Sequence, residues 1–229
     1  MATRPIFIPI LDGRLLYKEL RVDFEWNPGF AVVQKKKNIS AIHLAGREAG
    51  LTNILEVSTK SDSELGRRLS AFNLKYTLAN GEGVPLECVY QGSKAFEHGG
   101  PFHDLYHAQP KDAKRDIRLK KSGNLVAFNL ESEPFPTHPK HAFYDWIYIR
   151  CVYQHHLWLA SKLSYDAFTD IEYNPAKSIS CQARSCAILC ALLARGQLGF
   201  AMKSPANFIQ CLTGSATETL KSPKGTLFE

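Results

Sequence analysis

The sequence lacks any apolar run that approaches the ~20 residues needed to cross a bilayer. Its first nine residues contain one arginine and no long apolar stretch ahead of a small-residue cleavage site. We therefore expect neither a membrane anchor nor a secretory signal, and we expect a cytoplasmic protein. Internal repeats and low-complexity segments are also lacking.

Closely spaced CxxC pairs, which are typical of zinc sites, are missing although the chain has six cysteines. Most of these cysteines lie in apolar runs with helical spacing. They are Cys88, Cys151, Cys181, Cys186, Cys190 and Cys211. We interpret them as reduced core residues of a cytosolic protein, and we expect no metal and no bound cofactor. A metal site would have to use Cys181, Cys186 and Cys190.

What is present is enough for one packed core. The chain has 229 residues, of which 45% are hydrophobic and 11% aromatic, so a single domain over residues 1–229 is expected. The net charge of +6 is compatible with a phosphate-bearing partner but does not require one. The run Lys35 to Lys37 is more typical of a solvated helix face than of a DNA contact.

Hydrophobic periodicity predicts an α+β fold, mainly helical, with a small β-sheet from the N-terminal third. Asp12-Gly13 predicts a hairpin turn between the first two strands. The expected strands cover residues 5–10, 15–26 and 54–58, and the expected helices cover residues 30–49, 85–97, 110–121, 142–163 and 178–198, with a Pro-rich loop at 129–140. The last two helices are apolar almost all round and should be buried.

Glu87, Gln91 and Lys94 are spaced i, i+4 and i+7, which would place them in one stripe of the helix expected at 85–97. Val89 and Phe96 would then face the core. Gly92 is unfavourable inside a helix and indicates a close approach of another backbone or of a ligand. The stripe could also be an ordinary solvated Glu–Lys pair, so the spacing alone leaves both interpretations open.

The segment LECVYQGSKAF around these residues resembles the signature of the NADAR (YbiA-like) family. Further elements occur in that family's order: LSAF at 69–72, QPKDAKR at 109–115, FYDW at 143–146, DAFTDI at 166–171 and CQARSCAILCALLAR at 181–195. Ala71 replaces an Asn of the family pattern, and DAFTDI lacks its Trp and Gly. The resemblance covers roughly residues 55–195 and leaves residues 1–50 as an N-terminal extension without an assigned role.

Two stretches, ILEVSTKSDSELGRRLSAFNL and YDAFTDIEYNPAKSISCQARS, resemble the divergent NADAR antitoxins associated with DarT-type toxins. The resemblance implies an N-glycosidase that removes ADP-ribose from guanine bases in DNA, expected to be single-stranded, and so opposes the toxin. Two alternatives remain: an N-glycosidase of a small phosphorylated metabolite, and a non-catalytic module that binds ADP-ribose or nucleic acid.

The resemblance also implies roles for the stripe. Glu87 would be the general acid/base and Lys94 the nucleophile, through a Schiff base to the opened ribose, while Gln91 would contact substrate. A nucleophilic lysine must be neutral, whereas a nearby Glu87 carboxylate would keep it protonated. Either Glu87 is itself protonated, or Lys94 acts only as a fixed positive charge.

The remaining candidates each have a structural alternative. Asp145 and Asp170 would assist Lys94 or bind ribose hydroxyls, although Asp145 could simply cap a helix. Lys114 and Arg115 would bind the diphosphate near a helix start, or be surface charges.

Other side chains of the matched segments are expected around the substrate. Tyr90 and Trp146 would stack on a base, or belong to the core. Arg184 would bind substrate or pair with Asp166 or Asp170. Ser70 and Asn73 would line the pocket.

Overall fold

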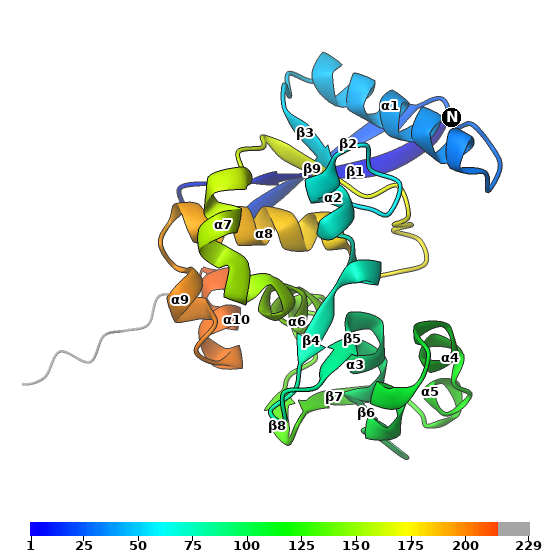
Figure 1. The fold of residues 1–229 in the computed structure, drawn as a ribbon, viewed down its shortest axis with the longest axis vertical. Helices are drawn as coiled ribbons and strands as arrows, with labels where there is room; N and C mark the ends of the chain where they lie inside the picture. Colours follow the sequence, from blue (N-terminus) through cyan, green and yellow to red (C-terminus); the bar gives the residue numbers. More distant parts are fainter. Residues whose placement is uncertain (215–229) are drawn as a thin grey trace, which may run out of the picture.

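The computed structural model describes residues 1–214, and its largest sheet has four strands in the order β2-β1-β9-β3 (Figure 1). β1 (Ala2–Pro9) and β2 (Tyr17–Phe24) form the predicted antiparallel hairpin, with Asp12 and Gly13 in its connection. β9 (Ala167–Thr169) pairs with β1 and runs parallel to β3 (Ile54–Glu56). The prediction of a sheet from the N-terminal third was therefore incomplete, since β9 comes from far along the chain.

Helix α1 (Val32–Glu48) covers one face of this sheet, and its bounds match the prediction closely. Ile39 and Ile42 pack there against Ile6, Val22 and Phe24 in a small core of their own. Val22 and Phe24, alternate residues of β2, face this core, as expected of a strand with one buried face. Helix α1 thus fixes the sheet from the side opposite the larger core.

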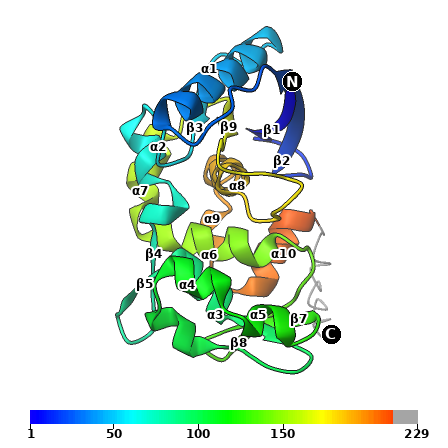
Figure 2. The same cartoon turned by 90° about the vertical axis from the view of Figure 1, so that its right-hand side faces the viewer.

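Two buried helices fill the centre of the molecule below the sheet, α6 (Ala142–Val152) and α8 (Gln182–Ala194) (Figure 2). The prediction of one helix over 142–163 was wrong. The chain breaks at η3 (Tyr153–His155), where the Tyr153 carbonyl accepts a hydrogen bond from the His156 ring. Beyond the break, α7 (His156–Lys162) lies at the surface.

The part of the molecule below α6 contains two small sheets. One consists of β4 (Lys75–Thr77) and β5 (Gly83–Pro85), and the other of β6 (Lys94–Phe96), β7 (Leu125–Leu130) and β8 (Glu133–Phe135). The expected loop at 129–140 is thus partly a hairpin. Its turn residues Glu131 and Ser132 both have positive φ, as in the turns that suit two-residue hairpins.

Short helices connect these elements. They are α2 (Glu64–Arg68), η1 (Ala71–Asn73), α3 (Leu86–Gly92), η2 (His103–His107), α4 (Pro110–Arg115), α5 (Arg118–Lys121), α9 (Leu198–Ala201) and α10 (Pro205–Thr213). The helix predicted at 110–121 starts at Pro110 but splits after Arg115. Asp116 leaves the helical conformation there, and its carboxylate accepts a hydrogen bond from the backbone N–H of Arg118.

The six cysteines are all free, and every one except Cys211 is buried. Within residues 1–214, no cluster of three or more His, Cys, Asp or Glu side chains could hold a metal ion. No helix in the same residues combines the length and hydrophobicity of a membrane span.

Candidate functional site

The candidate site lies at the C-terminal end of α3. This helix ends five residues earlier than the sequence predicts. The predicted helix 85–97 stops at Gly92, and Lys94 lies on β6, where it pairs with Phe128 of β7. The ring of Tyr106 occupies the space beside Gly92, and a Cβ there would lie 2.6 Å from a ring carbon. The Phe102 carbonyl oxygen, 3.0 Å from the same point, is the predicted close approach of another backbone, whereas the approach of the Tyr106 side chain was not predicted. Phe96 is partly exposed on β6 and does not anchor a helix in the core.

Glu87, Gln91 and Lys94 are nevertheless in contact, through a chain of two hydrogen bonds. The Gln91 amide donates to Glu87 Oε1 over 2.8 Å, and its oxygen accepts from Lys94 Nζ over 2.7 Å. Only this orientation of the amide satisfies both neighbours, because a carboxylate accepts and an amine donates. Gln91 is buried and thus separates the carboxylate from the amine.

The surroundings of Lys94 lower its pKa and so increase the share of the neutral amine at pH 7. Burial lowers the pKa of Lys94 to about 8; the Glu87 carboxylate raises the pKa, and the Lys114 ammonium lowers it further. Nζ of Lys94 also lies 4.5 Å from the centre of the Tyr90 ring. Because Gln91 keeps Glu87 at a distance, desolvation outweighs the attraction that would hold the amine protonated.

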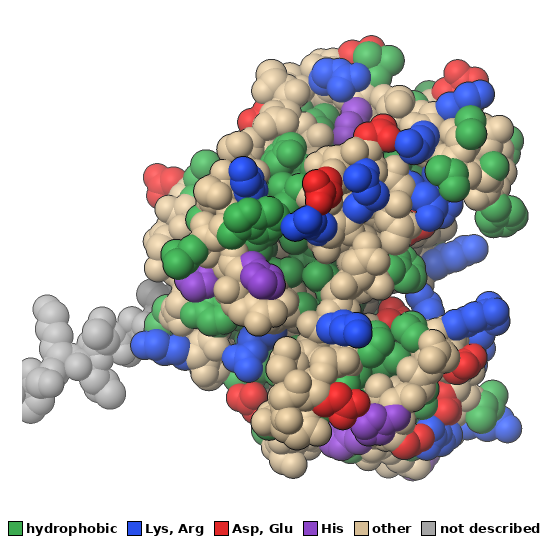
Figure 3. Space-filling view, viewed as in Figure 1, with side chains coloured by type: hydrophobic (Ala, Val, Ile, Leu, Met, Phe, Trp, Pro, Cys, Tyr) green, Lys and Arg blue, Asp and Glu red, His purple; other side chains and the backbone are tan. Residues whose placement is uncertain are grey.

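These side chains line one wall of a cleft of about 550 Å³. The opposite wall is the loop 175–180, which leads from β9 to α8 on the right of Figure 1. Lys94, Lys114 and Lys177 line the cleft, and Glu87 supplies the one carboxylate among the described residues that line it. Figure 3 shows Lys and Arg side chains projecting at this edge of the molecule, between the part that carries the sheet and the part that carries α4. The cleft is therefore suited to an anionic ligand.

A smaller hollow of about 140 Å³ continues from the cleft, and we call it the inner branch. It shares Glu87 and Lys114 with the cleft and adds a set of polar and aromatic side chains. These are Phe72, Tyr144, Asp170, Glu172, Tyr173 and Gln182. Burial and the neighbouring Glu56 raise the pKa of Asp170 to about 8, so its carboxyl group is protonated at neutral pH.

Asp145 and Arg184, two predicted site residues, form a buried ion pair between α6 and α8. Arg184 Nε lies 3.1 Å from Asp145 Oδ2, which also accepts from His141 Nδ1, while Ser185 Oγ donates to Asp145 Oδ1. Burial raises the pKa of Asp145, but Arg184 and His141 more than offset it and leave it below its ordinary value. The structural partner predicted for Arg184, Asp166 or Asp170, was wrong, since its partner is Asp145.

The other predicted residues divide between the cleft and the rest of the molecule. Tyr90, Lys114 and Asp170 line the cleft or its inner branch. Ser70, Asn73, Arg115 and Trp146 are not among the described residues that line either. Trp146 is packed in the core beside Phe135, Ser70 is fully buried, Arg115 is exposed on α4, and Asn73 donates to the carbonyl of Arg67.

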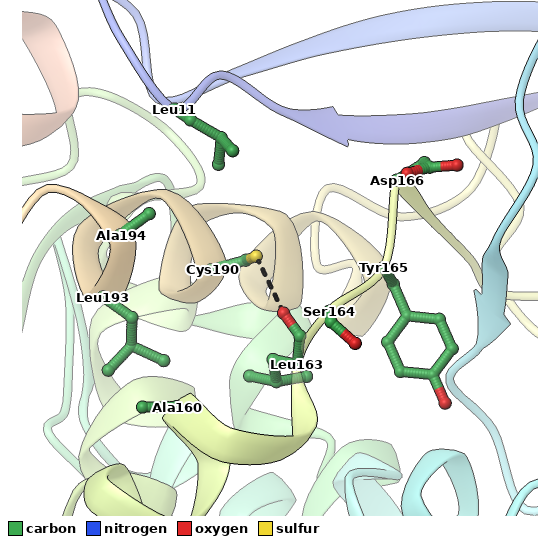
Figure 4. A pocket seen from close by; sticks show the side chains of 9 residues that line it. All are labelled: Leu11, Ala160, Leu163, Ser164, Tyr165, Asp166, Cys190, Leu193 and Ala194. Atoms are coloured by element: carbon green, nitrogen blue, oxygen red, sulfur yellow. Dashed lines mark hydrogen bonds between the residues drawn. The ribbon is translucent and has the colours of Figure 1, made fainter.

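Another cavity, of about 410 Å³, lies between α7 and α8 (Figure 4). Its lining is mostly apolar, and Cys190 Sγ donates to the Leu163 carbonyl. Asp166 is the charged residue among the described residues that line it, and its carboxylate accepts hydrogen bonds from Thr52 and Asn53. None of the described residues that line this cavity is a lysine, arginine or histidine, so it lacks a cation or an imidazole base to activate Cys190.

Sequence reasoning missed the loop 175–180, together with Tyr144, Glu172, Tyr173 and Gln182. The position of this loop in the sequence could have indicated its role. The polar run PAKSIS follows a short apolar segment and precedes a buried helix. Loops in such positions often carry ligand contacts. The strand character of residues 167–169 had to be recognised first.

Comparisons with known proteins identify the family of the chain. A search of curated proteins returned no match. A family model described as the DarT1-associated NADAR antitoxin matches residues 2–222, which is nearly the whole chain and includes the N-terminal 50 residues. The chain therefore belongs to the family of DarT1-associated NADAR antitoxins.

Proposed function

We propose that this protein is an N-glycosidase that removes ADP-ribose from guanine bases in DNA and thereby reverses the action of a DarT-type toxin. Membership of the antitoxin family supports the pairing with such a toxin. The observation that carries the proposed chemistry is the chain Glu87–Gln91–Lys94 on the wall of a basic cleft.

The bond to be broken joins the anomeric carbon of the ribose to a guanine nitrogen. Glu87 is the proposed acid, because its side chain is one-quarter exposed and lines both the cleft and its inner branch. In its protonated form Glu87 transfers that proton to the departing guanine nitrogen while positive charge develops on the sugar, and the carboxylate left behind takes up a proton again before the next turnover. The product is unmodified guanine, still attached to its DNA strand.

Lys94 is the proposed nucleophile. With a pKa of about 8, the neutral amine is roughly one-tenth of the population at pH 7, far more than for an unshifted lysine. The amine nitrogen bonds to the anomeric carbon, and loss of its proton with opening of the ribose ring gives a Schiff base. Addition of water and release of the amine then yield free ADP-ribose and restore Lys94.

The diphosphate of ADP-ribose is negatively charged, and the cleft supplies positively charged lysine side chains to bind it. Lys114 and Lys177 lie on opposite walls, with Ser178 and Ser180 beside Lys177. We propose that these side chains hold the diphosphate, while the inner branch with Asp170 and Tyr144 receives ribose hydroxyls or the base.

The test is incubation of the purified protein with a single-stranded oligonucleotide that carries ADP-ribosylated guanine. We expect release of ADP-ribose and recovery of unmodified guanine, with losses of at least about a hundredfold for Glu87→Gln and Lys94→Ala. Lys120→Ala, at an exposed position on α5, is the control and should retain activity. Release only from a free ADP-ribosylated nucleotide would favour a metabolite glycosidase, and binding without release would favour a non-catalytic module.

A further inference from the structure

A groove lies on the other side of η1 from the inner branch of the cleft. Ala71 and Phe72 of η1 line the inner branch, whereas Asn73 lines a groove of about 420 Å³ that runs between β4 and α7. At roughly 2.0 Å per residue in a 3₁₀ helix, the step across η1 is about 6 Å. We call this hollow the flanking groove and define it by Arg68, Asn73, Lys75, His155 and Trp158.

Two large aromatic side chains are exposed along this path. Phe72 is 68% exposed at the mouth of the inner branch, and Trp158 is 43% exposed in the flanking groove. The amide of Gln182 fixes η1 beneath Phe72, because its oxygen accepts a hydrogen bond from the Ala71 N–H over 2.6 Å. Phe72 is therefore held on a rigid turn with its ring available to a ligand.

The charge of the flanking groove is positive. Arg68 and Lys75 line it with His155, and none of the described residues that line it is acidic. Arg68 also pairs with Glu64 over 2.6 Å, but both side chains are more than half exposed, so this ion pair holds Arg68 only weakly. Exposed aromatic rings interleaved with cations are the combination that binds single-stranded nucleic acid, through base stacking and phosphate contacts.

We propose that the flanking groove binds the single-stranded DNA next to the modified guanine. Phe72 and Trp158 stack on neighbouring bases, and Arg68 and Lys75 face the phosphates between them. A base-paired strand would keep its bases stacked inside the duplex and could not use these rings, so the groove favours unpaired DNA. This inference rests on the proposed function for its substrate, but the binding of DNA can be measured without catalysis.

The first experiment measures binding of an unmodified oligodeoxythymidine of about 12 nucleotides by fluorescence anisotropy. Trp158→Ala should raise Kd about tenfold, because loss of one stacked base typically weakens binding by that order, whereas Trp158→Phe should retain most of the affinity. Lys75→Glu should weaken binding and reduce its salt dependence. The controls are Leu157→Ala, at a 78% exposed position on α7, and Lys18→Glu on the edge strand β2; both should bind as the wild type does.

The second experiment compares ADP-ribosylated guanine in the oligonucleotide with the same group on a mononucleotide. Trp158→Ala should raise KM for the oligonucleotide about tenfold and leave both kcat and the mononucleotide reaction unchanged. The inference is overturned if Trp158→Ala and Lys75→Glu bind the unmodified oligonucleotide as the wild type does, or if both substrates are affected equally. If the wild type releases ADP-ribose from neither substrate while the binding pattern holds, the proposed function fails and the groove assignment stands.

Discussion

The side-chain amide oxygen of Gln91 accepts a hydrogen bond from Nζ of Lys94 over 2.7 Å, and the same amide donates to Glu87. A carboxylate in direct contact with Lys94 would keep the amine protonated and prevent it from acting as a nucleophile. The Gln91 amide lies between the two groups and avoids that contact. The amide satisfies both groups, and the carboxylate does not contact the amine directly. Burial then lowers the pKa of Lys94 to about 8 despite the presence of Glu87.

The separation of Glu87 from Lys94 by Gln91 can be tested by placing a second carboxylate beside Nζ of Lys94. Gln91→Glu is nearly isosteric, but its negative charge should raise the pKa of Lys94. Each unit of increase lowers the neutral fraction at pH 7 about tenfold, so kcat/KM at pH 7 should fall by at least that factor. The pH profile of kcat/KM should show its inflection moved above pH 8.

Gln109→Glu is the matched control, because it makes the same charge change at an exposed position next to α4. Its pH profile should resemble that of the wild type. An unchanged inflection in Gln91→Glu would show that the ionisation of Lys94 does not control the reaction.

The junction between α3 and β6 depends on Gly92. In Gly92→Ala the new methyl group would lie 2.6 Å from a ring carbon of Tyr106, so either the ring or the helix end must move. We expect the free energy of unfolding to fall by about 1–3 kcal/mol, as for overpacked cores, even though alanine is the better helix former. Chemical denaturation measures this change.

Gly199→Ala provides the contrast for that measurement. Gly199 lies in α9, where an added Cβ meets no atom within 4 Å among the described residues. Its replacement should leave stability unchanged or raise it by up to about 1 kcal/mol. Equal stability of Gly92→Ala and the wild type would contradict the packing described for Tyr106.

Much of the fold follows from local sequence pattern, and the failures have physical causes. The helical spacing of apolar residues predicts α1, and two long apolar segments predict α6 and α8, although the first of them was wrongly extended over α7. Asp12-Gly13 predicts the hairpin of β1 and β2. The short strand β9 is defined mainly by its pairing with β1 and β3, which no local pattern reveals.

In the candidate site, too, local sequence predicts some contacts, whereas others depend on tertiary packing. The spacing of Glu87, Gln91 and Lys94 correctly predicts that they meet, although Lys94 lies on a strand rather than on the helix. The ion pair of Asp145 and Arg184 joins residues 39 positions apart on two helices, so it depends on tertiary packing. The same holds for the loop 175–180, which lines the cleft and connects β9 to α8, two elements that are packed together.

The ion pair of Asp145 and Arg184 should matter for stability rather than for the chemical step. Asp145→Asn leaves Arg184 buried without its counter-charge, and loss of one partner of such a pair typically costs about 3–5 kcal/mol. Chemical denaturation should show this loss, while kcat per folded molecule should stay within about threefold of the wild type. A large fall in kcat with unchanged stability would instead make Asp145 a catalytic residue.

Asp170 should make stability depend on pH. Its pKa is raised to about 8 in the folded state, so between about pH 5 and 7 the folded protein holds a proton that the unfolded chain releases. Stability therefore falls as pH rises through this window, by about 1.4 kcal/mol per unit from this group. Asp170→Asn keeps an oxygen for the N–H groups of Glu172 and Tyr173 and should remove this slope.

The comparison requires denaturation curves of Asp170→Asn and the wild type at several pH values. Asp112→Asn, at an exposed position on α4, is the control and should follow the wild type. Parallel stability curves for Asp170→Asn and the wild type would show that Asp170 is ionised in the folded protein at neutral pH.

The most direct test of the account is reductive trapping at Lys94. The protein is mixed with an oligonucleotide bearing ADP-ribosylated guanine in the presence of borohydride, and its peptides are analysed by mass spectrometry. We predict a reduced ADP-ribose adduct on the peptide containing Lys94, no adduct with Lys94→Arg, and loss of turnover in that variant. Continued turnover by Lys94→Arg, with no adduct on the wild-type protein, would contradict covalent catalysis and leave Lys94 as a fixed positive charge.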